Sequence, residues 1–334
     1  MSSTSASAGK LKGRGWKHVV KATLQRFSIN KSTDLAASLT YYAVLALFPG
    51  LLAVVSVLKL SGIGETLVPE LTALIKEAVP DQGTVDLLVP IIEGFFSSAG
   101  AGLALIIGIG TAMWAASGYV AAFARAHNRV YDTAEGRHPV RLKLQQLALT
   151  ATILLGVVLL LGAVVLSGDL ARWIGDLAGL GSQAVRVWDL AKWPVMLLLT
   201  MGLVAALYHW TPNIAFPRFR PITVGSTVAV LVAVIAAAGF SFYASRFGSY
   251  DKTYGTLAGV IIALWLVWLI NLALVFGATL DAEVRRTRQL AAGEPAERQP
   301  LLPPRAFDGI IKARQKANAV AAEGHQIRVE AAAD

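Results

Sequence analysis

The chain has 334 residues, of which 55% are hydrophobic and only 15% charged, and its mean hydropathy is +0.58. A soluble domain of this length can bury one long apolar helix but not several, so this composition excludes an ordinary water-soluble protein. The absence of cysteine excludes disulfides, a thiol nucleophile and a Cys metal site.

Residues 1–33 are basic and are predicted to be a cytoplasmic N-terminus with one amphipathic helix. Its apolar positions follow a helical spacing on a single face: Trp16, Val19, Val20, Thr23, Leu24 and Phe27. Lys17, Lys21 and Arg26 lie away from that face. Two interpretations stay open: the helix lies in the membrane interface with its cations on anionic headgroups, or it packs on the ends of a helix bundle.

Six long segments without a charged side chain follow. They are Leu35–Leu58, Gly94–Ala124, Leu144–Gly168, Trp193–Pro217, Pro221–Ser245 and Thr253–Leu280. About 20 apolar residues cross a bilayer as a helix, and lipid requires backbone groups to be satisfied within each segment. We therefore predict an all-α polytopic membrane protein. The six transmembrane helices are expected near 35–58, 98–123, 145–168, 193–211, 222–245 and 255–280, within a domain over 34–284.

Apolar stripes between the first two spans also predict short amphipathic interfacial helices over 66–97, on the outer face. The Pro-rich, polar residues 285–334 are expected to form a cytoplasmic, largely disordered tail.

The basic residues are distributed unevenly. Of the 30 Lys and Arg residues, 23 lie before the first span, in alternate loops or after the last span. Positively charged loops stay in the cytoplasm, so both termini are expected there. This topology also accounts for the pI near 9.8 without a nucleic-acid partner.

Small residues recur at every fourth position of the fifth span: Gly225, Ala229, Ala233, Ala237 and Ser241. Such a stripe lets helix backbones approach closely in lipid and predicts a central helix, packed closely with the second span. The alternative is that an Ala-rich helix produces the stripe by chance.

Polar groups at membrane depth are the candidate substrate contacts. Asn271 lies inside the sixth charge-free segment, Tyr41 and Tyr42 lie in the first, and Pro49 is expected to kink the first span. We predict a lipid-accessible cleft between the first and sixth spans that holds Tyr41, Tyr42 and Asn271. The alternative for Asn271 is an interhelical hydrogen bond.

The stretches "LAASLTYYAVLALFPGLLAVVSV" (35–57) and "YGTLAGVIIALWLVWLINLALVFGATLDAEV" (254–284) resemble the YihY/BrkB family of bacterial inner-membrane proteins. The resemblance covers roughly residues 15–290 and implies six spans with cytoplasmic termini. Members have been called virulence factors, some carry a ribonuclease label, and lipid transport is suspected for relatives.

The residues themselves favour no enzyme. The five histidines, His18, His127, His138, His209 and His325, fall in five different segments, and no nuclease or hydrolase motif is present. No catalytic residue, metal site or cofactor is expected. The first hypothesis is a transporter, flippase-like or scramblase-like protein for a lipid or other amphiphile. A structural or envelope-assembly role is the second, and a membrane-bound ribonuclease the third. A homo-oligomer stays open.

Overall fold

Eight long helices make up the described part of the chain. The computed structural model describes residues 11–60, 102–165, 182–246 and 257–333, with the single positions 72, 73, 76, 85, 86, 89 and 90. Within these residues the only β-type pairing is an isolated bridge between Ile214 and Pro304. The helices are α1 (Gly13–Ile29), α2 (Ser32–Leu60), α5 (Gly102–Val130), α6 (Pro139–Val165), α8 (Ser182–Trp210), α9 (Val224–Arg246), α11 (Leu257–Ala291) and α12 (Asp308–Glu330). The predicted interfacial helices over 66–97 lie largely outside the described residues.

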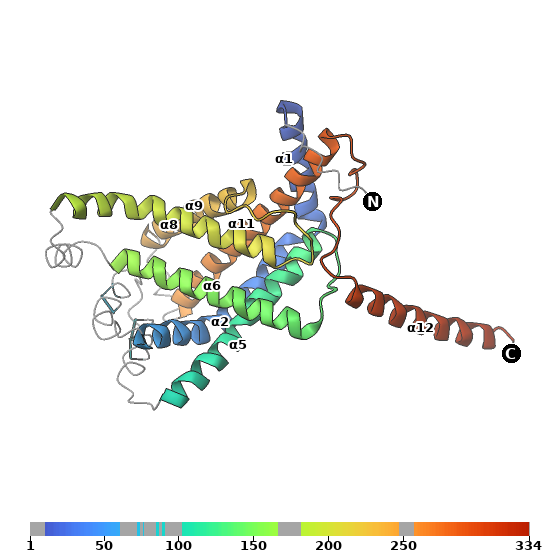
Figure 1. Ribbon diagram of the computed structural model, residues 1–334, viewed down its shortest axis with the longest axis horizontal. Coiled ribbons are helices and arrows are strands. Elements are labelled where there is room, and N and C mark those ends of the chain that lie inside the picture. The colour runs from blue at the N-terminus through green and yellow to red at the C-terminus, as the bar shows by residue number, and fades with distance from the viewer. Residues whose placement is uncertain are drawn as a thin grey trace.

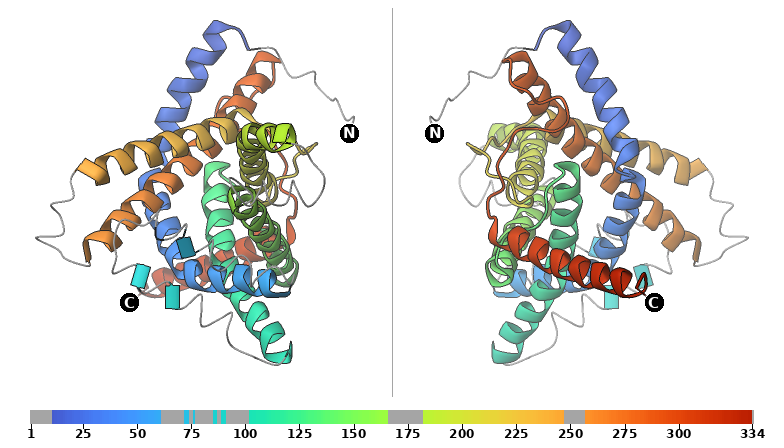
Figure 2. Two further views of the ribbon diagram at one scale, coloured as in Figure 1. Left: turned by 90° about the vertical axis from the view of Figure 1, so that its left-hand side faces the viewer. Right: turned by 90° about the vertical axis from the view of Figure 1, so that its right-hand side faces the viewer.

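Six of these helices pack as a closed ring. Each helix contacts the next in the order α2, α5, α6, α8, α9 and α11, and α11 returns to α2. Helix α1 runs beside the last part of α11, whereas α12 projects away from the bundle (Figure 1). Figure 2 shows α1 beside α11 from two further sides. Helices α5 and α9 are not adjacent in the ring, so the expected close pair of these two helices is not formed.

Length and composition make three helices capable of crossing a membrane: Pro139–Val164, Val185–Trp210 and Ile261–Ala291. A fourth apolar segment, Val224–Phe240, is shorter. Large apolar side chains on the outside of these helices are exposed, including Leu159, Leu198 and Ile235. A water-soluble protein rarely exposes so many large apolar side chains, whereas a surface that faces lipid commonly does. It stays a prediction that α2, α5 and α9 also cross the membrane, which would make six spans.

The core lies inside the ring, at the end where α1 and α12 attach. We call this end the polar end, because the loops over 131–138 and 211–223 also lie there. The core cluster combines Phe123 of α5, Tyr208 of α8, Ala229 of α9 and Val275 of α11, all nearly inaccessible. It is built from distant parts of the chain, as ring closure requires.

The backbones of α9 and α11 approach each other closely. A Cβ atom added to Gly277 would overlap the carbonyl oxygen of Gly225 and would lie 2.7 Å from both the Cβ atom of Ala229 and the hydroxyl of Tyr208. The backbone N–H of Gly225 donates to Asp281 Oδ1 at 2.7 Å, which satisfies a free donor in the first turn of α9. Glycines at this crossing are therefore a steric requirement.

The small-residue stripe of α9 is buried only at its first part. Gly225 and Ala229 are buried, whereas Ala233 and Ala237 are half-buried. The side chain of Ser241 lies outside the described part. Exposed residues on α9, such as Val234, show that this helix is peripheral in the ring. Helix α11 packs most extensively on its neighbours, which are α9, α2, α1 and α5.

The predicted apolar stripe of α1 is only partly buried against the bundle. Val19 and Thr23 are buried, and Phe27 packs edge-on against Phe276 of α11 with ring centroids 5.7 Å apart. Trp16 and Leu24 stay exposed. Part of the stripe thus packs on the bundle, and the rest of the stripe is exposed on the surface of the protein.

Residues 285–334, for which the sequence predicts a largely disordered tail, contain the last part of α11 and all of α12. Helix α11 continues to Ala291, seven residues beyond the predicted boundary at 284. Glu283 explains the extension, because its carboxylate pairs with Arg286 at 3.0 Å and with Arg26 of α1 at 3.5 Å. The charges that follow the sixth charge-free segment therefore join two helices. Helix α12 follows as a helix without any buried residue.

Candidate functional site

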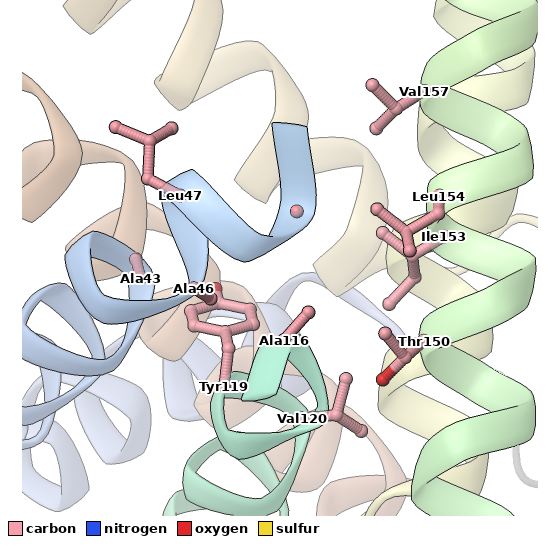
Figure 3. Close-up of a pocket in the computed structure, with 11 residues that line it drawn as sticks. Ala43, Ala46, Leu47, Ala116, Tyr119, Val120, Thr150, Ile153, Leu154 and Val157 are labelled. Carbon is pink, nitrogen blue, oxygen red and sulfur yellow. The ribbon is translucent and has the colours of Figure 1, made fainter. Parts of the chain in front are cut away.

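An apolar pocket of about 270 Å³ opens between α2, α5 and α6 (Figure 3). The residues that line it are almost all aliphatic, and Tyr119 and Thr150 are the exceptions. Ligand pockets range from about 300 to 1,000 Å³, so this pocket is at the small end of that range. The residues that line it are Ala43, Ala46, Leu47, Gly50, Ala116, Tyr119, Val120, Thr150, Ile153, Leu154 and Val157.

Small residues create the pocket. Helix α2 contributes Ala43, Ala46 and Gly50, and α5 contributes Ala116, so the side chains of these two helices leave space opposite the larger side chains of α6. Pro49 directly precedes Gly50 inside α2 and has no N–H to donate to the carbonyl four residues earlier. The helix continues through Pro49.

Tyr119 connects the pocket to a buried polar group. Its ring lines the pocket, and its hydroxyl donates to Asn271 Oδ1 of α11 at 2.8 Å. The Asn271 amide donates in turn to Val267 O at 3.0 Å and to Thr40 Oγ1 of α2 at 3.3 Å. Asn271 is only 2% exposed, so its amide is satisfied entirely by protein. These bonds join α2, α5 and α11.

The predicted substrate-binding residues are not gathered in one cleft. Tyr41 is 61% exposed on the outside of α2. Tyr42 contacts Tyr41, and the guanidinium of Arg125 lies 5.1 Å from the centroid of the Tyr42 ring. Asn271 lies behind Tyr119, and none of the three predicted residues lines the pocket. The sequence predicts a cleft between α2 and α11, and this pocket lies between α2, α5 and α6.

Sequence reasoning missed Tyr119. A signal was available, since Tyr119 is a polar aromatic residue inside the charge-free segment Gly94–Ala124. A hydroxyl buried in an apolar segment needs a partner, and Asn271 was the evident amide at similar depth. Pairing the two would have placed α5 against α11.

Hydrogen bonds between loops hold the polar end together. Asn213 is fully buried; its backbone N–H donates to Asn128 Oδ1 at 2.7 Å, and its side-chain amide donates to Ala134 O at 3.0 Å and Ala306 O at 2.9 Å. The N–H of Ala306 returns a bond to Asn213 Oδ1 at 3.0 Å. A Cβ atom on Gly136 would overlap the carbonyl of Ala306. The segment after α11 is thus fastened to two loops.

An ion pair beside these loops has a perturbed carboxylate. Arg137 donates through Nη2 to Glu135 Oε2 at 2.7 Å, and Asn128 donates to the same oxygen at 3.1 Å. Burial by itself would raise the pKa of Glu135, but the hydrogen bonds and charge of Arg137 outweigh burial and hold that pKa below its ordinary value. Arg137 also donates to the carbonyl of Thr211 at 2.7 Å, which closes the end of α8.

His127 is the buried histidine of the polar end. Its ring lies 4.7 Å from that of Phe123 and 5.0 Å from that of Tyr208, measured between centroids. Burial lowers the pKa of His127 to about 3, although its hydrogen bond with the backbone of Phe123 opposes the change. The imidazole is therefore neutral at physiological pH and serves as part of the aromatic core. Among the described residues, no three His, Asp or Glu side chains come together as a metal site.

Comparison with known proteins identifies the chain. The family model "Virulence factor BrkB" matches residues 23–301. YfkH of Bacillus subtilis, whose name carries a ribonuclease-like label, is 26% identical over 276 residues, which cover 83% of this chain and 98% of YfkH. A UPF0761 membrane protein of Photobacterium profundum is 27% identical over 280 residues, with 81% and 82% of the two chains covered.

A further UPF0761 membrane protein, from Tolumonas auensis, is 34% identical over 151 residues that cover 43% of this chain and 48% of the relative. No solved structure matches. The matched region contains all six helices of the ring and ends before α12. The chain is a membrane protein, and it belongs to the BrkB family.

Proposed function

We propose that this protein binds a lipid or another amphiphile in the α2–α5–α6 pocket and moves it across a bacterial inner membrane. The observation that carries the proposal is the pocket itself. It is aliphatic and lies among helices whose outer surfaces are apolar. An acyl chain suits such walls better than a polar solute, because a polar solute would find few hydrogen-bonding partners in the pocket.

The proposed topology has six spans formed by α2, α5, α6, α8, α9 and α11, with the polar end in the cytoplasm. The excess of Lys and Arg supports this orientation, since the loops of the polar end include Arg137, Arg218 and Arg220. Helices α1 and α12 lie at the same end of the bundle (Figure 1). Both termini would then be cytoplasmic.

Movement through this protein would be passive. Helices α5 and α6 contain no acidic residue, and the single acid of α2 is Asp34 in its first turn. A proton- or sodium-coupled pump usually holds a carboxylate at membrane depth. The pocket walls offer hydroxyls and aliphatic groups instead, which suits a scramblase-like path.

Helix α1 supports a membrane-surface role for the N-terminal segment. Trp16, Val20 and Leu24 are exposed on one side of α1, next to Lys17 and Lys21. This combination inserts apolar side chains below the headgroups and leaves the cations at anionic lipids. Anionic lipids are therefore the proposed partners at the cytoplasmic face.

The test is lipid movement in reconstituted vesicles. Purified protein is placed in liposomes with a fluorescent phospholipid, and an impermeant reductant reports how much label reaches the outer leaflet. Wild type should expose the inner-leaflet label faster than empty liposomes. Ala116→Trp, which fills the pocket, should slow the exposure, whereas Ile235→Trp on the exposed side of α9 should not. Wild-type rates equal to those of empty liposomes would overturn the proposal.

An assembly role is the second candidate, and α12 is the observation that favours it. This helix buries no residue and presents Ile311, Val320 and Ile327 to solvent. An isolated helix is marginally stable in water, and a partner or a second copy would stabilise it. Removing residues 308–334 should leave lipid movement intact under the first proposal and abolish association under the second, as measured by the mass of the purified complex.

A further inference from the structure

The ammonium of Lys143, in the first turns of α6, is held by a hydroxyl and an aromatic ring. Lys143 Nζ donates to Ser117 Oγ of α5 at 2.6 Å and lies 3.9 Å from the ring centroid of Trp114. The carbonyl of Trp114 is a weaker acceptor at 3.4 Å. An ammonium has three N–H donors, so a third remains for another acceptor.

No carboxylate neutralises this lysine in the part of the chain that the structure describes, where the salt bridges involve other residues. Helices α5 and α6, which hold the ammonium, have no acidic residue at all. A cation next to hydrocarbon is costly unless it finds a counter-charge. Protein does not supply that charge here, whereas a membrane contains phosphate groups.

Lys143 lies on the face of α6 that lines the pocket. Thr150, which is in the pocket wall, follows seven residues later, which is about 10.5 Å along the helix and within about 20° of the same direction. On α5, Ser117 is the neighbour of Ala116, another residue of the pocket wall. The cation and the apolar pocket are therefore about the distance apart that separates a headgroup from the middle of an acyl chain.

Trp114 gives the site a membrane-facing side. Its side chain is 61% exposed, while Ser117 beneath it is fully buried. The ammonium thus contacts one buried group and one exposed group, and a lipid headgroup would reach it from the side of the exposed ring.

We propose that Lys143, positioned by Ser117 and Trp114, binds the phosphate of a phospholipid whose acyl chain occupies the α2–α5–α6 pocket. This inference rests on the proposed function, because it takes the pocket as the lipid site. It adds that the preferred lipid is anionic overall, as in phosphatidylglycerol, where no choline or ethanolamine cation competes with Lys143 for the phosphate.

The test measures which lipid stays bound. Purified protein is exchanged into an equimolar mixture of phosphatidylglycerol and phosphatidylcholine, and native mass spectrometry gives the ratio of the two lipids retained. One lysine near a membrane surface contributes about a five-fold preference for an anionic lipid. Lys143→Gln should therefore lower the ratio about five-fold, and Lys143→Arg should keep it. Arg141→Gln is the matched control, since Arg141 is an exposed cation on the same helix.

Trp114→Leu tests the same site at an exposed position where the fold is not at risk, and it should lower the ratio by a smaller factor. An unchanged ratio in Lys143→Gln, or an equal loss in Arg141→Gln, would overturn the headgroup site. Inorganic phosphate that displaces phosphatidylglycerol better than sodium chloride of equal ionic strength would overturn the lipid assignment in favour of a free-anion site. None of these readouts requires movement, so wild type that keeps the preference but moves no lipid would refute the proposed function alone.

Discussion

Replacing Gly277 by alanine should separate two helices of the ring. The added Cβ atom would overlap the carbonyl of Gly225 and lie 2.7 Å from the Ala229 Cβ atom and the Tyr208 hydroxyl. Ordinary van der Waals contact begins at 3.4 Å, so α9 must retreat from α11 by at least about 0.7 Å, the difference between these two distances. That retreat also lengthens the hydrogen bond from the Gly225 N–H to Asp281, now 2.7 Å.

Overpacking of this kind costs about 1–3 kcal/mol. Gly239→Ala is the matched control, because Gly239 lies in α9 with nothing within 4 Å of an added Cβ atom, and alanine is by itself the better helix former. The assay is thermal unfolding of the purified proteins in one detergent. Gly277→Ala should melt several degrees below Gly239→Ala. Equal melting temperatures would mean that the glycines are not needed for close packing, and the explanation of the α9–α11 contact would be wrong.

Three further substitutions test the polar groups. Glu135→Gln should destabilise the protein at pH 7; because the folded pKa of Glu135 is lowered, the wild-type advantage is present above the unfolded pKa, near 4.5, and is lost as the pH falls through the folded value, so melting curves from pH 7 to pH 3 should converge. Asn271→Leu removes the acceptor of the Tyr119 hydroxyl and should cost about 0.6–1.7 kcal/mol in a denaturation experiment. Asn213→Ala removes both side-chain bonds to Ala306, and limited proteolysis should then cut residues 292–307 faster than in wild type.

The sequence predicts where the helices of the bundle lie along the chain better than it predicts which helices contact one another. Charge-free segments indicate where helices lie because lipid excludes charge, and α6, α8 and α11 match three of them. Helix α11 runs past its charge-free segment because Asp281 and Glu283 are used between helices, with the N-terminus of α9 and with Arg26 of α1. A pattern of charges along one segment cannot reveal such partners, since they come from other segments.

The candidate site shows the same limit. Tyr119 and Asn271 are 152 residues apart. The position of each residue within its charge-free segment indicates its depth in the membrane, but it does not indicate which helix the side chain faces. Helix geometry also separates the two tyrosines. Tyr41 and Tyr42 are neighbours in a helix and point about 100° apart, so both cannot easily face one cleft. Tyr41 is accordingly exposed, while Tyr42 lies under Arg125.

The polar end and the walls of the pocket are held by different contacts, and this determines where the described part of the ring can open. Within the described residues, the loop hydrogen bonds of Asn213, the Glu135–Arg137 pair and the Glu283–Arg26 pair all lie at the polar end. Around the pocket, α2 and α6 face each other through aliphatic groups. Separating aliphatic walls costs little when lipid chains replace the lost contacts, whereas separating the polar end breaks charged and buried hydrogen bonds. A lipid that enters between α2 and α6 would therefore spread the helices about a fixed base at the polar end.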